Sequence, residues 1–523
     1  MGIPSYFSYI IKNHATIIKK QKNIRNIDNL YLDSNSIIYD SLYEINYTNN
    51  IDYEKNIIEK VIIKIKDYIK NINPAKSVFI AFDGVAPVAK LEQQRTRRFK
   101  SKYTEDIIKS VSEKTVVTRW DKTAITPGTN FMKNLTNEIK NAFINNKKVI
   151  VSGTDDVGEG EHKLFNFIRE NKEKHSKEVT LVYGLDADLI MLGLCNSYLC
   201  KEIYIYRETP EFIKSIDYNF EPNELYCLDI KSLSSSIVYE MTNKSHTSFL
   251  NKNILHDYIF ICFLLGNDFL PHFPALNIRT HGINILLSAY YNTLGRIKKT
   301  IINNGDINWG NFKKMIAWIK NNEENNLLIE YELRNKFECK RDYSKTPEEK
   351  LNIIPIKKRE IEKQINPFEP GWDKRYYKLL FNYDYNKELI KKICINYLEG
   401  LEWVFKYYTE DCCDWRWRYN YHYPPLFKDL VEYIPNWETI MIEENQNTPL
   451  EPIAQLAYVL PIQSINLLPK EVIENIREYE EDFYKDDFNI KWAFCKYLWE
   501  AHVDFTEVCI DEFERCVLKS LKV

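Results

Sequence analysis

The chain of 523 residues is long enough for more than one domain, and its composition, 28% charged and 44% apolar, is that of an ordinary globular protein. A net charge of −3 excludes a wholly basic nucleic-acid coat, so any nucleic-acid binding must come from local basic patches. No apolar run approaches the roughly 20 residues of a membrane span, and the eleven scattered cysteines lack zinc-ligand spacing. We therefore expect a protein of the cell interior with no membrane segment and no zinc site.

The first half of the sequence alternates short apolar runs with longer amphipathic stretches. The short runs predict buried strands, and the amphipathic stretches predict helices. The predicted strands are Asn29–Asp33, Val78–Asp83, Lys148–Ser152 and Val179–Gly184, and the clearest helices between them are Tyr53–Asn71 and Phe131–Asn145. This alternation is typical of an α/β fold in which a mostly parallel, twisted sheet is flanked by helices. Acids that end parallel strands then gather at the carboxyl edge of the sheet, where such folds usually bind ligands.

Residues 78–100 combine a strand that ends in an acid with a helix that carries cations. Asp83 and Gly84 close the apolar run, and Pro87 suits the first turn of the helix. One face of this helix carries Lys90, Gln94, Arg97 and Arg98. A carboxylate can hold a divalent metal and a cationic face can hold a phosphate, so the segment suggests phosphodiester chemistry. Without Asp83 and its strand, the same basic face would be interpreted as a solvated helix surface.

Acidic side chains follow the predicted strands or lie in nearby loops of the first 270 residues. They are Asp33, Asp83, Glu159, Glu161, Asp186, Asp188 and Asp268. Side chains at i and i+2 of an extended segment share a face, so each of the two i,i+2 pairs can direct both carboxylates to one point. Clustered carboxylates repel one another, and bound cations are the usual remedy.

All-oxygen ligation favours a hard ion, Mg²⁺, for which Mn²⁺ can substitute. Two such ions about 4 Å apart would activate a water and stabilise the leaving oxygen in an in-line displacement at phosphorus. Each acid taken singly would be interpreted as a helix cap or turn residue. Their occurrence at one predicted sheet edge favours the metal site.

Several motifs follow one another along the chain in a fixed order. In the first half they are Met1-Gly-Ile-Pro4, Leu32-Asp-Ser-Asn-Ser36, Phe82-Asp-Gly-Val-Ala-Pro87, Gln93-Gln-Arg-Thr-Arg-Arg-Phe99, Ile125-Thr-Pro-Gly-Thr129, Gly158-Glu-Gly-Glu-His-Lys163, Asp186-Ala-Asp188 and Leu265-Gly-Asn-Asp-Phe-Leu-Pro-His272. In the second half they are Pro370-Gly-Trp-Asp-Lys-Arg-Tyr-Tyr377, Asp414-Trp-Arg-Trp417, Tyr421-His-Tyr423, Val459-Leu-Pro461 and Leu467-Leu-Pro469. Jointly these motifs resemble the Xrn family of 5′→3′ exoribonucleases, and the resemblance covers most of the chain.

The resemblance implies roles for residues that match the family's motifs. The seven acids match metal-binding, catalytic carboxylates, and Lys90, Gln94, Arg97 and Arg98 match the pocket for the substrate's 5′-monophosphate. Trp415 matches one ring of a base clamp, and Tyr39 stands where the family more often has histidine. A tyrosine ring can still stack on a base.

The implied function is processive 5′→3′ hydrolysis of single-stranded, 5′-monophosphorylated RNA to nucleoside 5′-monophosphates, in RNA or mRNA decay. A decapping enzyme upstream would supply the substrate, and the expected form is a monomer in the cytoplasm, with the nucleus as the other compartment. The sequence given ends at the family's second conserved region, and from this we expect a compact form without the family's long carboxyl-terminal extensions, of the kind that a large DNA virus encodes.

The same resemblance divides the chain into three parts. We expect a nuclease domain over residues 1–299 with a flap-endonuclease-like or PIN-like core. A helical and loop connector follows over 300–365, and a mainly helical region over 366–523 packs against the nuclease domain and completes the active-site pocket. Two alternatives stay open at this point, a flap-type structure-specific endonuclease and an RNA-binding protein that has lost catalysis.

Overall fold

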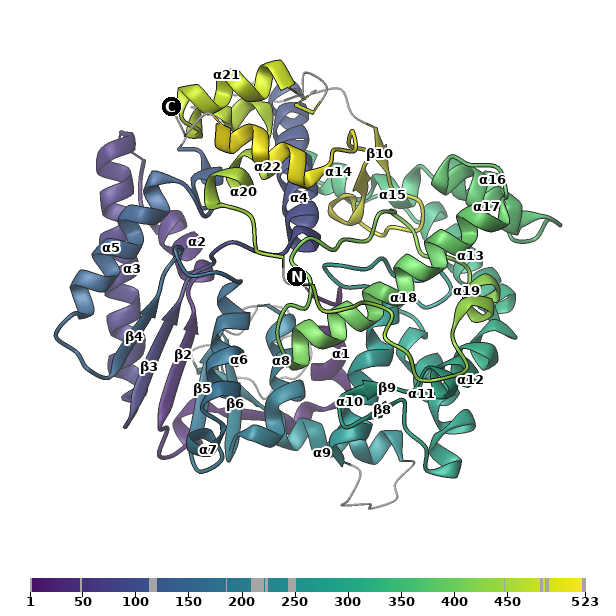
Figure 1. Ribbon diagram of the computed structural model, residues 1–523, viewed down its shortest axis with the longest axis horizontal. Helices are drawn as coiled ribbons and strands as arrows, with labels where there is room; N and C mark the ends of the chain where they lie inside the picture. The colour runs from purple at the N-terminus through teal and green to yellow at the C-terminus, as the bar shows by residue number, and fades with distance from the viewer. Residues whose placement is uncertain are drawn as a thin grey trace.

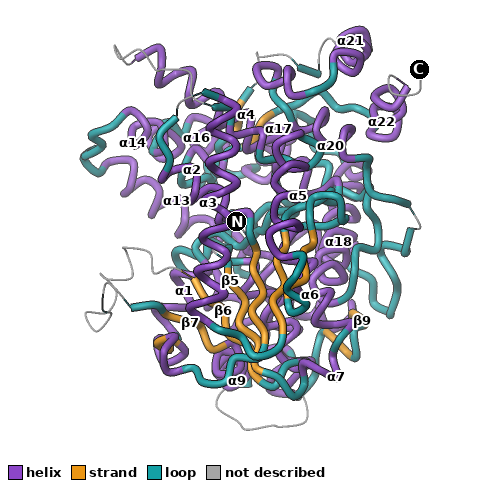
Figure 2. The backbone as a smooth tube through the Cα atoms, turned by 90° about the vertical axis from the view of Figure 1, so that its left-hand side faces the viewer, coloured by secondary structure: helices purple, strands orange, loops and turns teal. Residues whose placement is uncertain are grey.

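A seven-stranded sheet lies at the centre of the first half of the chain (Figures 1 and 2). The computed structural model describes residues 2–47, 49–111, 120–184, 186–207, 221, 224–242, 251–445, 447–479, 483–484 and 489–519. The strand order is β1-β7-β6-β5-β2-β3-β4. Neighbours among β4, β3, β2, β5 and β6 run parallel, whereas β7 is antiparallel to both β6 and β1.

The strands confirm the predicted α/β architecture. They are β1 Ile18–Lys20, β2 Asn29–Asp33, β3 Ser77–Ala81, β4 Val149–Ser152, β5 Val179–Tyr183, β6 Glu202–Arg207 and β7 Tyr226–Asp229. Two further two-stranded sheets pair β8 Ile302–Asn303 with β9 Asp306–Ile307 and β10 Ile490–Lys491 with β11 His502–Val503. The four predicted strands correspond to β2, β3, β4 and β5, and the sequence analysis did not predict β1, β6 and β7.

Alternate side chains of the central strand β2 enter two different cores. Leu30 and Leu32 pack in the core that α2, α3 and α5 share, and Tyr31 packs in the core that α6 and α8 share. Figure 1 shows α3 and α5 on the outer side of the sheet and α6 and α8 on its other side. Because both faces are covered, the parallel strands are apolar on both sides rather than alternating with polar residues.

The helices of this half connect the strands and surround the sheet. They are α1 Tyr6–Asn13, α2 Asn35–Glu44, α3 Asn50–Ile72, α4 Val88–Val111, α5 Asn130–Phe143, α6 Gly160–Glu170, α7 Lys172–His175, α8 Asp188–Asn196, α9 Ile230–Met241, α10 Asn251–Cys262 and α11 Gly282–Thr293. The two helices predicted between strands correspond to α3 and α5, which confirms that part of the sequence analysis. The predicted cationic helix is α4, which begins directly after Pro87.

The second half of the chain is mainly helical, as predicted. Its helices are α12 Trp309–Lys320, α13 Glu323–Cys339, α14 Pro347–Asn352, α15 Ile354–Lys357, α16 Glu360–Ile365, α17 Trp372–Phe381, α18 Lys387–Thr409, α19 Phe427–Tyr433, α20 Pro452–Val459, α21 Lys470–Tyr479 and α22 Ile510–Lys519. The core on the α6 side of the sheet continues into this half through Trp309, Tyr376, Trp403 and Phe427. In the part of the chain that the structure describes, no helix has both the length and the apolarity that crossing a membrane requires.

The start of α4 has a core of its own with the last helices of the chain. Val88 and Leu91 pack there with Leu456 of α20, Val472 of α21 and Phe513 of α22. Figure 1 shows these three helices grouped beside α4 at the top of the molecule. The C-terminal helices therefore fix the helix that carries the predicted phosphate-binding residues.

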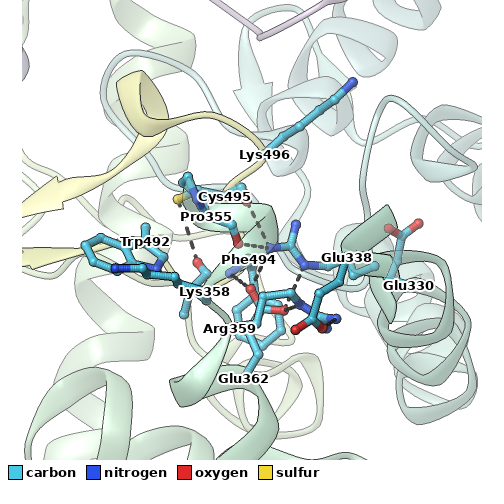
Figure 3. Close-up of polar contacts among 12 residues, drawn as sticks. Glu330, Glu338, Pro355, Lys358, Arg359, Glu362, Trp492, Phe494, Cys495 and Lys496 are labelled. Atoms are coloured by element: carbon cyan, nitrogen blue, oxygen red, sulfur yellow. Dashed lines mark hydrogen bonds and ion pairs between the residues drawn. The ribbon is translucent and has the colours of Figure 1, made fainter. Parts of the chain in front are cut away.

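A buried network of charges joins α13 and α16 to the segment after β10 (Figure 3). Glu362 accepts a 2.8 Å hydrogen bond from Arg334 Nε and a 2.6 Å one from Arg359 Nε. The backbone N–H of Phe494 also donates to Glu362, at 2.8 Å, and Arg334 donates to the carbonyl of Cys495 at 2.9 Å. Hydrogen bonds thus hold residues about 130 positions apart in one cluster.

Candidate active site

The carboxyl ends of β2 and β3 bring Asp33 and Asp83 to the same glycine. A Cβ atom on Gly160 would lie 2.8 Å from Asp33 Oδ1 and 3.4 Å from Asp83 Oδ1, so only glycine fits closely here. The Gly160 N–H donates a 2.7 Å hydrogen bond to Asp83 Oδ1, and Asn35 Nδ2 donates to Asp83 Oδ2 at 2.5 Å. Because Gly160 begins α6, the loop after β4 brings its own acids to the same place.

Three more acids reach the cluster from the start of α8 and from the segment after α10. Asp188 begins α8 and accepts a 2.7 Å hydrogen bond from the hydroxyl of Tyr408. Asp186 lies close enough to Asp188 to contribute to its raised pKa. The N–H of Gly2 donates to Asp268 Oδ1 at 3.1 Å, and a Cβ atom on Gly2 would lie 2.1 Å from Asp188 Oδ1. Five separate segments therefore place the seven predicted acids in one cluster.

A possible metal-binding group within this cluster includes a histidine that the sequence analysis missed. Single ligand atoms of Glu159, Glu161 and His162 lie within 4.8 Å of one another, and all three side chains are buried. Tyr407 donates to Glu159 Oε1 at 3.0 Å, and its ring stacks on the imidazole of His162 at 3.7 Å. Burial holds the pKa of His162 well below its ordinary value, so the ring is neutral and can offer a lone pair. The position of His162 directly after Glu161 was the sequence signal that could have identified it as a candidate metal ligand.

Burial of so many acids disfavours their ionised forms. Burial first, and the neighbouring carboxylates second, raise the pKa of Asp33 and Glu161 well above ordinary values. Burial and the neighbouring Asp268 raise the pKa of Asp188 to about 7. These acids gain most from a divalent cation, because it compensates both the lost hydration and the mutual repulsion. The donor set of carboxylate oxygens fits Mg²⁺ or Mn²⁺.

Lys90 lies inside the acid cluster and not only on the predicted phosphate-binding face. Its Nζ is 2.5 Å from Glu159 Oε2 and 2.7 Å from Asp268 Oδ2. Although burial opposes its charge, Asp268 and Glu159 hold the pKa of Lys90 well above its ordinary value. Lys90 also holds the pKa of Asp268 well below its usual range, against the effect of burial. The ammonium group therefore supplies one positive charge to a cluster of seven acids.

The other three residues of the predicted phosphate-binding face lie further along α4. Arg98 donates a 2.7 Å hydrogen bond to Thr126 Oγ1 and a 3.5 Å one to Gln94 Oε1. Burial and the neighbouring Arg97 lower the pKa of Arg98 to about 10, which leaves it charged at neutral pH. Arg97 is exposed and makes no hydrogen bond or ion pair with any residue that the structure describes. A free guanidinium beside a buried one is a suitable arrangement for a phosphate.

Comparison with known proteins agrees with this geometry. Residues 1–209 match the family described as XRN 5'-3' exonuclease N-terminus, and residues 248–355 and 344–508 match the Xrn1 helical domain. The chain belongs to the XRN family. The two matches cover both the strand-end acids and the helices that pack on them, so XRN membership accounts for both halves of the fold.

Several XRN proteins are similar to this chain over nearly all of its length. The human 5'-3' exoribonuclease 1 is 31% identical over 583 aligned positions, which include 96% of this chain and 33% of the human protein. The Drosophila melanogaster 5'-3' exoribonuclease 2 homolog is 25% identical and aligns with 96% of this chain and 69% of its own length. A solved catalytic core of Rad2 in complex with a DNA substrate is 12% identical, with a TM-score of 0.36 over 84% of this chain and 96% of that one. The chain spans a third to a half of the length of the exoribonuclease 1 relatives.

The two aromatic residues predicted to form a base clamp lie in different parts of the chain. Tyr39 is half-buried on α2, six residues after Asp33. Trp415 is also half-buried, and its carbonyl accepts a 2.9 Å hydrogen bond from the N–H of Val88, the first residue of α4. Its own N–H donates to Asn447 Oδ1 at 2.9 Å. The backbone of Trp415 is thus fixed to the start of the helix that carries Lys90.

We expect Mg²⁺ to stabilise this XRN chain against unfolding. A ligand that binds only the folded state adds about 2.7 kcal/mol at ~100 times its dissociation constant. Thermal unfolding in MgCl₂ and in EDTA measures the difference, with Asp186→Ala/Asp188→Ala as the matched variant. The wild type should melt several degrees higher in Mg²⁺, and the double variant should lose most of that shift. Equal melting temperatures of the wild type in the two buffers would contradict the metal site.

Proposed function

We propose that this chain is a metal-dependent 5′→3′ exoribonuclease that hydrolyses single-stranded RNA from a 5′-monophosphorylated end. The observation that carries the proposal is that Lys90, in the first turn of α4, lies inside the acid cluster, and that the same helix continues to Gln94, Arg97 and Arg98. Because Lys90 joins α4 to the acids, the helix fixes the distance between the phosphate-binding residues and the acid cluster, and so between the 5′ end and the bond that is cut. Such a fixed register favours cleavage one nucleotide at a time from the end.

In this proposal the chain's own residues position the reacting groups. The hydroxyls of Tyr407 and Tyr408 orient the carboxylates of Glu159 and Asp188, and Lys90 fixes Glu159 against Asp268. When bound, two Mg²⁺ ions supply the activated water and the positive charge that stabilises the leaving oxygen. The acids hold these ions, and no side-chain nucleophile is required.

Recognition of the 5′ end falls to Gln94, Arg97 and Arg98, with Tyr39 and Trp415 as the stacking rings. A guanidinium pair binds a terminal phosphate dianion more strongly than a diester or a hydroxyl. Each cut leaves a new 5′-monophosphate on the shortened RNA, so the product is again a substrate, and in this proposal the enzyme keeps that RNA between cuts, which makes degradation processive. The reaction that supplies the first substrate must leave a 5′-monophosphate, as removal of a cap does.

The decisive experiment compares one RNA, labelled at its 3′ end, with a 5′-monophosphate, a 5′-hydroxyl, a triphosphate or a cap. We expect mononucleotide release from the monophosphate substrate only, which requires Mg²⁺ and is lost in Asp186→Ala/Asp188→Ala. Cleavage that ignores the 5′ end, or that occurs at internal junctions, would indicate a flap-type endonuclease. Binding of RNA without hydrolysis would indicate a catalytically inactive binding protein.

The phosphate site makes a separate prediction. Replacing Arg98 with methionine should lower kcat/KM for 5′-monophosphorylated RNA by about 100-fold, because a buried charge-assisted contact is worth about 1.5–3 kcal/mol. Binding of 5′-hydroxyl RNA, which makes no such contact, should change little. Initial rates on the monophosphate substrate and the dissociation constant of 5′-hydroxyl RNA measure the two effects. Lys109→Met, which removes an exposed cation from the far end of α4, is the matched control. A loss of 5′-hydroxyl RNA binding as large as the loss of kcat/KM would show that Arg98 acts only through folding.

A further inference from the structure

A cavity of about 700 Å³ lies next to the acid cluster, along α4, and Arg97 is the residue of the proposed phosphate-binding face that lines it. Its lining includes α4, the segment 265–272 that carries Asp268, and the segments 380–383, 418–422 and 499–507 from the second half of the chain. Tyr383 and Trp499 line it with side chains that are 56% and 40% exposed. The cavity therefore reaches from the interior to the surface.

This cavity is in direct contact with the acid cluster, because Asp268 lines it. Gly2 lines the cavity, donates to Asp268, and lies so close to Asp188 that a Cβ atom would be 2.1 Å from its Oδ1. Asp268 also lines the cavity, while its carboxylate pairs with Lys90. A molecule in the cavity is thus adjacent to the place where the phosphodiester would be cut.

Two cations of α4 face the cavity without a carboxylate partner among the described residues. Arg97 makes no ion pair, and the Nζ of Lys100, one turn later, donates to the carbonyls of Trp499 and Ala501, both at 2.6 Å. Arg95 is not available, because its guanidinium lies 3.7 Å from the ring centre of Phe483. Three other cations of the lining form ion pairs: Arg279 with Glu500, Arg418 with Glu92, and Lys491 with Asp504. Glu507 also lines the cavity and offsets one of the two charges of Arg97 and Lys100, which leaves net positive charge for an anion.

An aromatic ring lies beside this positive charge. Trp499, whose carbonyl accepts from Lys100, has its indole stacked on the ring of Tyr497 with centroids 5.9 Å apart and an interplanar angle of 18°. A ring that is supported on one side and partly exposed is a suitable platform for a nucleobase. A phosphate dianion and a flat base are the two ends of a nucleoside 5′-monophosphate.

We propose that this cavity receives the nucleoside 5′-monophosphate after each cut and releases it to solvent. The inference rests on the proposed function, because RNA that threads inward 5′ end first fills the entrance and blocks the product's return. Arg97 is adjacent to Arg98 in sequence and one turn before Lys100, so α4 places it between the phosphate-binding face and the cavity. The product's phosphate can pass from Arg98 to Arg97 and then to Lys100.

The test separates cleavage from product release. The substrate is a 5′-monophosphorylated RNA that carries a label at this phosphate. Its second internucleotide linkage is a non-hydrolysable phosphonate. Each enzyme molecule therefore cuts once and keeps the shortened RNA. Rapid quenching measures cleavage, and rapid filtration measures release of the labelled mononucleotide. The variant Thr96→Trp fills the cavity from α4. The matched control is Ser101→Trp, an exposed position of α4 outside the lining.

We expect Thr96→Trp to cleave at the wild-type rate and to release the mononucleotide at least tenfold more slowly, with Ser101→Trp like the wild type. Release of the mononucleotide from Thr96→Trp at the wild-type rate would overturn the proposal that the product leaves through the cavity. It would leave the exonuclease proposal intact. Absence of cleavage by the wild type would overturn the proposed function, and with it the proposal that the product leaves through the cavity.

A second measurement does not depend on the folding of Thr96→Trp. Added adenosine 5′-monophosphate should inhibit the wild type noncompetitively with respect to RNA, because it enters from the cavity. Trp499→Ala should raise the inhibition constant about tenfold, since it removes a stacking ring. Competitive inhibition, or an unchanged constant in Trp499→Ala, would overturn the proposal.

Discussion

Replacing Asp188 with asparagine should lower RNA hydrolysis by on the order of 10³-fold and, at the same time, stabilise the metal-free protein. The loss corresponds to about 4 kcal/mol of transition-state stabilisation, which is within the range of a metal-ion contribution. Asparagine keeps the oxygen that accepts from Tyr408 but removes a negative charge from the buried cluster. Steady-state rates in Mg²⁺ and thermal unfolding in EDTA measure the two effects, and Asp67→Asn, at an exposed position of α3, is the control.

The stabilisation should depend on pH in a defined direction. The pKa of Asp188 is raised to about 7, so the folded state binds a proton that the unfolded state releases near pH 4. The wild type therefore loses stability as pH rises through this interval, and the variant does not. In EDTA the variant should melt at a higher temperature than the wild type at pH 8, and this advantage should shrink at pH 5.5. An advantage that is independent of pH would show that repulsion at Asp188 is not its cause.

Replacing Glu362 with glutamine should destabilise the fold by about 3–5 kcal/mol, the usual cost of removing one partner from a buried ion pair. The carboxylate is fully buried and pairs with two guanidinium groups, those of Arg334 and Arg359 (Figure 3). Glutamine offers one acceptor oxygen and no charge, so at least one buried arginine loses its compensation. The free energy of unfolding by urea measures the effect.

The control for this prediction is two residues away on the same helix. Glu360 is exposed, and Glu360→Gln should change the unfolding free energy by less than about 0.5 kcal/mol. Because the network holds Phe494 and Cys495, close to the wall of the cavity beside α4, Glu362→Gln should also make residues 490–503 more accessible to hydrogen exchange. Equal stability of the two variants would mean that the network does not hold this segment.

The sequence by itself determined the elements that are local. The strands β2 to β5 are short apolar runs; Asp33 ends β2, and the other acids of the cluster except Asp268 lie in the segments that directly follow β3, β4 and β5. Parallel strands share a carboxyl edge, so these acids had to meet once the sheet was predicted. The cationic face of α4 follows from helical periodicity in the same way, and the family motifs extended both predictions across the chain.

Only the tertiary structure decided which groups surround these acids. Tyr407 and Tyr408 bond to Glu159 and Asp188 across 248 and 220 residues of sequence. Lys90 pairs with Asp268 because the segment after α10 packs beside α4. No local sequence pattern encodes that packing. The same holds for the Glu362 network and for the cavity beside α4, whose walls come from segments that are far apart in the sequence. Such contacts depend on packing between remote elements, whereas strand and helix patterns depend on residues a few positions apart.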